Sequence, residues 1–451
     1  MLHWQPGYVY PPVFYPPHYA LGPLHALLYV AIAIVVGFLT YRRPALGVGA
    51  MIVCLPFAEA RYAFDTSMTI PKAAFAGFVL ALLWHRPSFA ILRRPPMPLI
   101  VSAFAAVLLA IALSAVTALH KEAVLREFAK WLEYAILFVT VAVAFDNDSD
   151  DRPIWWSLIG IAIFESLYGI AQLFVGAPSG VIVQNHILPR IAGSLEGPNQ
   201  FSGWLNLIFP VLFARMLLHR SAWLVLAVAL SGAATALTLS RSGIVAAFVA
   251  IAIVIAMSRP PKNVSLRLAG GGAIALAVLI GAALMVGFEW HFFSLAEVPV
   301  PNHLGTRAIL WTSAATLWQH SPIVGVGAGN FELDLGLVGH PDVRTHANSV
   351  YLQFLAETGA IGFAALLWLI YATIVPFVRR YSRRALVIGF AAANIAIVLH
   401  QIFDYLWFFP KVGGVWALLL GIAVAELLAS REDAGAIPHV IRSRQRETVP
   451  S

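Results

Sequence analysis

Four arginines in segments otherwise poor in positive charge could bind an anion. Arg190 precedes the segment IAGSLEGPNQFSGWL, and Arg241 lies in the short connection LTLSRSG. Arg307 opens a predicted amphipathic helix, and Arg344 lies two residues before His346. Guanidinium groups bind phosphate oxygens through two parallel hydrogen bonds, so four that converge would form a phosphate or pyrophosphate site. Taken alone, each arginine is better explained as a side chain that reaches to the membrane surface; taken together, they favour the anion site.

His346 is the candidate general base. It precedes the apolar segment that begins near Val350, so it would lie at the mouth of a helix, and an imidazole suits proton transfer near neutral pH. From the residues alone the better explanation is a helix-capping region, in which Asn348 or Ser349 binds free backbone amides. The chain has no HExxH or CxxC element and no P-loop, so we expect neither a catalytic metal nor direct use of ATP.

The composition places these residues in a membrane protein. Of the 451 residues, 60% are hydrophobic and 11% are charged, and the mean hydropathy is +0.80. Such a chain has too little polar surface to cover a water-facing shell. The single cysteine, Cys54, excludes an internal disulfide and fits a small core residue.

The apolar runs predict an all-α polytopic fold of about thirteen transmembrane helices, within a range of about twelve to fourteen. We expect one transmembrane domain over residues 1–451, with 44–60 and 70–85 as possible re-entrant segments. The predicted spans are 24–40, 44–60, 70–85, 98–118, 128–145, 154–176, 199–217, 221–238, 241–257, 267–288, 350–378, 384–405 and 411–429.

The distribution of charge predicts the orientation. About two thirds of the 29 basic residues fall in alternate loops and in the tail 430–451, which the positive-inside rule places in the cytoplasm. The net charge of +7 is therefore a topology signal, and nucleic-acid binding is not needed to explain it. The loops 177–198 and 289–349 then lie on the outer side of the membrane. The longer one would cap the site with an amphipathic helix over 305–319, whose apolar positions are Ile309, Leu310, Ala314, Leu317 and Trp318, and would turn at Gly325–Gly329.

Motifs over about 185–365 resemble the O-antigen ligase and polymerase superfamily. They are RIAGSLEGPN (Arg190 to Asn199), Ser240–Gly243, the run from Arg307 to Phe331 with GVGAGNF, and the run from His346 to Gly362. In many members a histidine lies nearer the Tyr-Leu pair, where this chain has Asn348. The base is therefore either His346 from a shifted register or another residue.

The resemblance implies a GT-C-like, metal-independent, inverting glycosyltransferase of the bacterial inner membrane that needs no cofactor. The donor would be a glycan on undecaprenyl pyrophosphate, and the acceptor a hydroxyl of lipid A–core, of another lipid-linked glycan or of a protein. His346 would be catalytic, the four arginines would bind pyrophosphate, and Asn199 and Asn348 would support them. Ligation to lipid A–core is the favoured reading. A transporter of lipid-linked saccharides remains the alternative of another class, although no internal repeat supports it.

Overall fold

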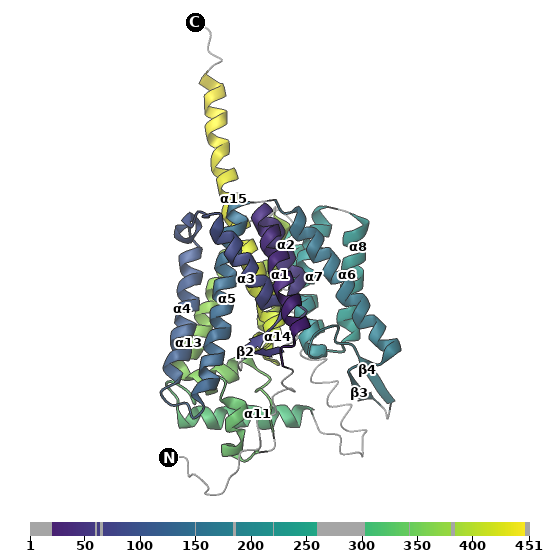
Figure 1. Ribbon diagram of the computed structural model, residues 1–451, viewed down its shortest axis with the longest axis vertical. Coiled ribbons are helices and arrows are strands. Elements are labelled where there is room, and N and C mark those ends of the chain that lie inside the picture. The colour runs from purple at the N-terminus through teal and green to yellow at the C-terminus, as the bar shows by residue number, and fades with distance from the viewer. Residues whose placement is uncertain are drawn as a thin grey trace.

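The structure is a bundle of membrane-spanning helices closed at one end by loops and short helices (Figure 1). The computed structural model describes residues 20–58, 61–63, 66–148, 150–183, 186–219, 221–258, 303–341, 343–379 and 384–446. Below, the cap face is the end of the bundle that carries residues 303–349, and the tail face is the opposite end.

Eight of the described helices are long and apolar enough to cross a membrane. They are α1 (Pro23–Arg42), α4 (Met97–Ser114), α5 (Lys121–Asn147), α6 (Arg152–Val175), α7 (Pro198–Leu218), α9 (Arg241–Ser258), α13 (Val350–Val378) and the first part of α15 (Pro410–Arg446). Shorter apolar helices are α2 (Pro44–Cys54), α3 (Ile70–Trp84), α8 (Ala222–Leu237) and α14 (Ala385–His400). The all-α polytopic prediction is confirmed; each predicted span within the described residues coincides with a helix, and the predicted span 267–288 lies outside them.

Close helix contacts depend on small residues. A Cβ added to Gly77 of α3 would lie 2.0 Å from the carbonyl oxygen of Ala33 in α1. One added to Gly389 of α14 would lie 2.4 Å from the Cα of Val211 in α7. Helices in lipid associate through such packing, because no water is released when their apolar surfaces meet. The first part of α15 runs through the middle of the bundle, and 94% of its apolar window is buried (Figure 1).

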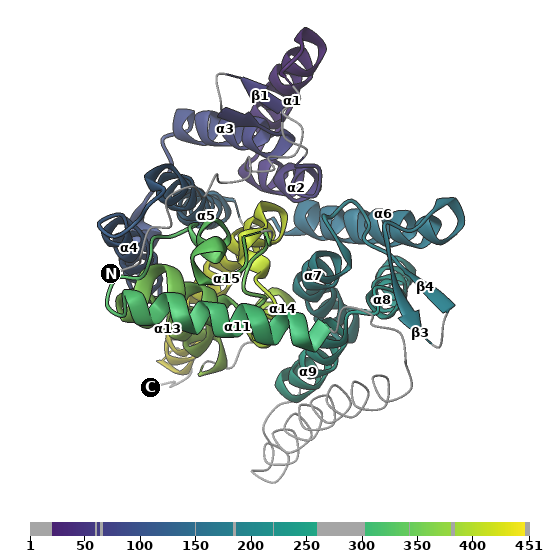
Figure 2. The same ribbon diagram turned by 90° about the horizontal axis from the view of Figure 1, so that it is seen from below.

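The cap face carries α11 (His303–His320), α12 (Phe331–Asp334) and the 3₁₀ turn η2 (Leu335–Val338). Helix α11 lies across the end of the bundle, as Figures 1 and 2 show. Its buried side chains include Leu310, Ala314 and Leu317, whereas Ile309 is 46% exposed and points elsewhere. The predicted amphipathic helix is therefore present, with a narrower apolar face than the sequence suggested.

Two short antiparallel hairpins complete the cap face. Strands β1 (Arg61–Ala63) and β2 (Thr66–Met68) form one, and β3 (Ser179–Val183) and β4 (His186–Arg190) form the other. In the second hairpin Ser179 pairs with Arg190, so Arg190 ends the hairpin where the chain turns toward α7.

Helix α13 is broken at Gly359, and the cap binds the break. Gly359 has φ 62° and ψ −163°, values that interrupt the helix. The amides of Val326 and Gly327 donate to the carbonyls of Ala356 and Glu357 at 3.0 and 2.9 Å. In return, the amides of Ala360 and Ile361 donate to the carbonyls of residues 322 and 323. The left-handed Gly325, Gly327 and Gly329 form the turn that the GVGAG sequence predicted.

Candidate active site

Three of the four predicted arginines come together on the cap face. Arg190 ends β4, Arg241 is the first residue of α9, and Arg307 lies in the first turns of α11. Burial lowers the pKa of Arg190, and the positive charges of Arg241 and Arg307 lower it further. The carboxylate of Asp404 acts in the opposite direction. Since charges act on one another in this way only over short distances, Arg190 lies near Arg241, Arg307 and Asp404, and the three arginines are called the arginine cluster below.

The Arg190 guanidinium is held in place from two sides. Its Nε donates to the carbonyl oxygen of Thr238 at 2.8 Å, and an Nη donates to Oδ1 of Asn199 at 3.0 Å. Asn199 is the second residue of α7, and Thr238 follows the last residue of α8. Asn199 therefore orients an arginine of the cluster.

His346 lies next to a buried carboxylate. Its Nε2 is 4.0 Å from Oδ1 of Asp404, and the two side chains are 13% and 2% exposed. The Nδ1 of His346 accepts the backbone N–H of Asn348 at 3.2 Å. The neutral ring therefore carries its proton on Nε2, the atom that faces Asp404. A hydroxyl oxygen seated beside both atoms can accept from Nε2–H and donate to Asp404.

Asn348 contributes through its backbone. Its φ of 51° lies in the left-handed region, which asparagine tolerates better than most residues. This conformation directs its N–H to Nδ1 of His346. The amide of Val350, the first residue of α13, donates instead to the carbonyls of Gln401 and Asp404. The start of α13 is thus fixed by the segment after α14, without the side-chain cap that Asn348 or Ser349 could have supplied.

Aromatic rings surround His346. The rings of Tyr405, Phe408 and Phe409 lie 6.3, 5.8 and 5.8 Å from the imidazole, centroid to centroid. Lys130 of α5 lies 4.9 Å from the centroid of the Phe408 ring. Burial lowers the pKa of His346, Asp404 raises it, and the charges of Arg307 and Lys130 lower it. The net lowering keeps the imidazole neutral near pH 7, the state in which it can take part in proton removal.

Asp404 is the site residue that the sequence did not single out. It fell inside the predicted span 384–405, but α14 ends at His400 and Asp404 lies in the segment that follows. Its Oδ1 accepts the backbone N–H of Tyr405 at 2.7 Å, which fixes the carboxylate. A buried acidic residue at the end of an apolar helix was the available signal, because such charges are costly without a partner.

Arg344 has different neighbours from the other three arginines. One Nη donates to the carbonyl oxygens of Glu332 and Val343 at 3.1 and 3.2 Å. Burial, followed by the charge of Glu127, raises the pKa of Glu332, and Arg344 opposes this effect. These contacts favour a role in holding the cap together.

No group of three histidine, cysteine or acidic side chains in the described residues could hold a metal ion. The acidic residues that follow α5 are far in sequence from this site, and they pair with arginines. Asp148 and Asp150 pair with Arg43, and Asp150 also pairs with Arg152.

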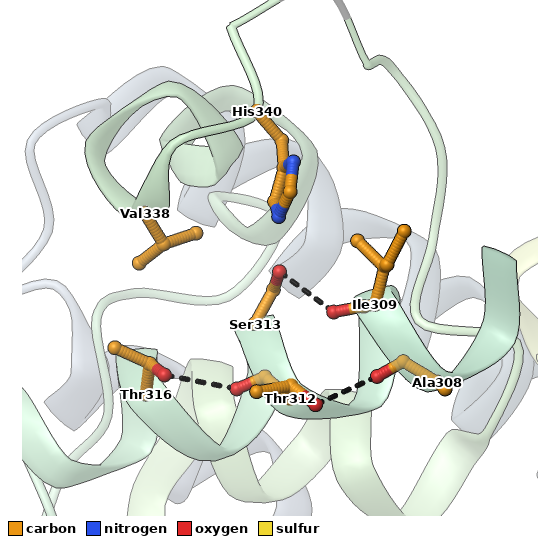
Figure 3. Close-up of a pocket in the computed structure, with 7 residues that line it drawn as sticks. All are labelled: Ala308, Ile309, Thr312, Ser313, Thr316, Val338 and His340. Atoms are coloured by element: carbon orange, nitrogen blue, oxygen red, sulfur yellow. Dashed lines mark hydrogen bonds between the residues drawn. The ribbon is translucent and has the colours of Figure 1, made fainter. Parts of the chain in front are cut away.

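A separate hollow lies between α11 and the segment of η2 (Figure 3). It has a volume of about 280 Å³, and Ile309, Thr312, Thr316, Val338 and His340 are among its lining residues. The hydroxyls of Thr312 and Thr316 donate to carbonyls one turn earlier on α11. No arginine of the cluster lines it, so it is not part of the candidate active site.

One comparison with known proteins found a similarity over part of the chain. Residues 226–367 match the family model described as O-antigen ligase. The matched range contains Arg241, Arg307, Arg344 and His346, whereas Arg190 and Asp404 lie outside it. No curated protein matches the chain.

Proposed function

We propose that the protein moves a glycan from undecaprenyl pyrophosphate to an acceptor hydroxyl, because residues 226–367 match the family model of the O-antigen ligases, whose members are glycosyltransferase-type enzymes of the ligase and polymerase kinds. The proposed acceptor is lipid A–core, and the reaction is metal-independent and inverts the anomeric centre. One observation carries the proposal: the cluster of Arg190, Arg241 and Arg307 lies next to the buried pair His346 and Asp404.

The arginine cluster provides what the leaving group requires. Negative charge grows on the pyrophosphate as its bond to the sugar breaks. Fixed guanidinium groups in a site shielded from water stabilise that charge without having to reorganise during the reaction. Asn199 and the Thr238 carbonyl hold Arg190, so this guanidinium at least is oriented before the donor binds.

The pair of His346 and Asp404 receives the proton. The acceptor oxygen attacks the anomeric carbon, the carbon–oxygen bond to the pyrophosphate breaks, and undecaprenyl pyrophosphate leaves with the bonding electrons. The hydroxyl proton passes to the carboxylate of Asp404, while the Nε2–H of His346, 4.0 Å from Oδ1 of Asp404, donates to the acceptor oxygen and orients it. A single displacement of this kind inverts the configuration of the sugar.

The proposed setting is the bacterial inner membrane, with the cap face in the periplasm and the C-terminus in the cytoplasm. The charges support this orientation. Arg43, Arg94 and Arg152 lie on loops of the tail face, where each pairs with an aspartate, and the positive-inside rule places such loops in the cytoplasm. A reporter active only in the periplasm should therefore give signal when inserted within 289–349, and a cytoplasmic reporter when fused to the C-terminus.

The decisive experiment is transfer by the purified protein in a lipid nanodisc. A defined undecaprenyl-pyrophosphate-linked glycan is offered with lipid A–core, with a second lipid-linked glycan or with a peptide, each separately, and the product mass is measured with a chelator present. We expect a product with lipid A–core. A product only with the second glycan or the peptide would replace the ligase proposal with polymerisation or protein glycosylation.

The anion site is tested by Arg241→Ala and Arg307→Ala. A charge-assisted hydrogen bond is worth about 1.5–3 kcal/mol, so each variant should use the donor about ten- to a hundredfold less well. Arg→Lys should restore activity only in part, because an ammonium group cannot make the planar two-bond contact. Full activity of both alanine variants would refute the anion site. Movement of the donor across vesicles without any transferred product would instead indicate a transporter.

A further inference from the structure

An apolar groove opens on the lipid-facing side of the bundle between α2 and α6. The two helices touch near the tail face, where a Cβ on Gly49 would lie 2.9 Å from Oγ of Ser157. From there α6 leads away from α2 toward the cap face, as Figures 1 and 2 show. The groove between them has a volume of about 500 Å³ and carries no charged side chain. Its walls include Val53, Phe57, Trp156, Gly160, Ile161 and Phe164.

The cap end of the groove leads to the candidate active site. There the rings of Phe57 and Phe164 meet at 5.8 Å. The carbonyl of the neighbouring residue Pro56 accepts the hydroxyl of Ser194 at 3.4 Å. Ser194 lies four residues after Arg190, and its own carbonyl accepts Nζ of Lys411 at 2.6 Å.

Lys411 connects this end of the groove with the catalytic pair. Lys411 is the second residue of α15, and Phe409, two residues earlier, packs its ring 5.8 Å from that of His346. Lys411 also pairs with Glu196 at 3.4 Å. A hydrocarbon chain in the groove would thus end beside the loop that joins Arg190 to α7. Lys411 and the arginine cluster would lie on either side of that end.

We infer that the groove between α2 and α6 binds the isoprenoid chain of the lipid-linked donor. The inference rests on the proposed function, since only that function requires a lipid pyrophosphate at the arginines. The donor is favoured over the acceptor because Arg190, part of the pyrophosphate site, is on the same loop as Ser194. Gly160 supports a bound chain: a Cβ there would meet no atom within 4 Å, so the groove wall leaves room where a side chain would otherwise stand.

The expected effect is moderate for a physical reason. The isoprenoid chain lies in hydrocarbon whether or not it is bound, so binding in the groove removes no apolar surface from water. It contributes packing contacts and a fixed direction for the chain. Filling the groove should therefore weaken binding by about three- to tenfold.

Gly160→Leu tests the inference, and Gly232→Leu is the matched control. Gly232 is a glycine of α8 where a Cβ would meet only Phe209, at 3.7 Å. Leucine is a better helix former than glycine, so both variants should fold, which size-exclusion chromatography and the thermal midpoint will check. Binding of undecaprenyl pyrophosphate and of the short geranyl pyrophosphate to the protein in nanodiscs is then measured for each.

We expect Gly160→Leu to weaken binding of undecaprenyl pyrophosphate by about three- to tenfold and to leave binding of geranyl pyrophosphate unchanged, because the short chain does not reach into the groove. Gly232→Leu should change neither. Equal binding of the long lipid by wild type and Gly160→Leu would overturn the inference and show that bulk lipid fills the groove, while the proposed function stands. If wild type binds neither pyrophosphate, the proposed function itself fails.

Discussion

Replacing Asp404 with asparagine tests whether His346 and Asp404 act as a pair. Asparagine keeps the shape of the side chain and an oxygen that can accept the N–H of Tyr405, but removes the charge. Because Nε2 of the neutral His346 ring already carries a proton, the hydroxyl proton can pass only to the Asp404 carboxylate, 4.0 Å away. A positioned general base contributes about a hundred- to ten-thousandfold to the rate, so the variant should lose turnover by about that factor.

The pH dependence of kcat/KM is a second measurement on the Asp404→Asn variant. In the wild type, Asp404 is the group that raises the pKa of His346, against burial and the charges of Arg307 and Lys130. Without Asp404 only the lowering effects remain, so the pKa of His346 must fall. The acid limb of the kcat/KM profile should move to lower pH while the plateau drops.

Asp334→Asn is the control for this experiment. Asp334 is also a buried carboxylate of the cap, 1% exposed, on α12. It is not among the groups that act on the pKa of His346, so its replacement should leave transfer unchanged. Turnover and a pH profile for Asp404→Asn that match the wild type would refute the paired role. An equal loss in both carboxylate variants would mean that the effect is structural.

Three further predictions concern the cap. Asn348→Gly should retain most activity. Asn348→Val should lose about tenfold or more, because valine resists the left-handed conformation that directs the N–H to His346. Equal rates of the two variants in the transfer assay would refute this backbone role. Burial raises the pKa of Asp334 to about 7 in the folded protein, whereas the pKa of an aspartate in the unfolded chain is about 3.9. The charged form of Asp334 therefore destabilises the fold, and it does so increasingly as the pH rises from about 4 to above 7. Asp334→Asn should therefore raise the thermal midpoint at pH 8, by an effect of about 2–4 kcal/mol, and change it little at pH 4; an equal change at both values would contradict the burial argument. Gly359→Ala should sharply reduce the yield of folded protein, because its Cβ would lie 2.3 Å from the backbone of Ile323, and Gly160→Ala, where there is open space, should not.

The sequence revealed the helices because lipid requires each span to be apolar and to satisfy its own backbone. It also revealed three of the clustered arginines, since a cation on a face poor in positive charge needs a reason to be there. The sequence did not reveal Asp404 as a site residue, because its role depends on a contact between distant parts of the chain. The segment after α14 folds back onto the start of α13. Arg344 looked like the other arginines for the same reason: only the fold shows that it binds the carbonyl of Glu332.

The break in α13 also limits how the enzyme can open. Four hydrogen bonds join residues 322–327 to residues 356–361, and they replace bonds that an unbroken helix would have made within itself. Lifting this part of the cap would leave those backbone groups without partners at the edge of the membrane, at a cost of several kcal/mol. Residues 322–327 of the cap are therefore a fixed anchor on α13, so any opening of the cap has to leave this segment in place. A lipid-linked substrate of the proposed reaction would then reach the site from the side of the bundle, past a cap that stays attached to α13.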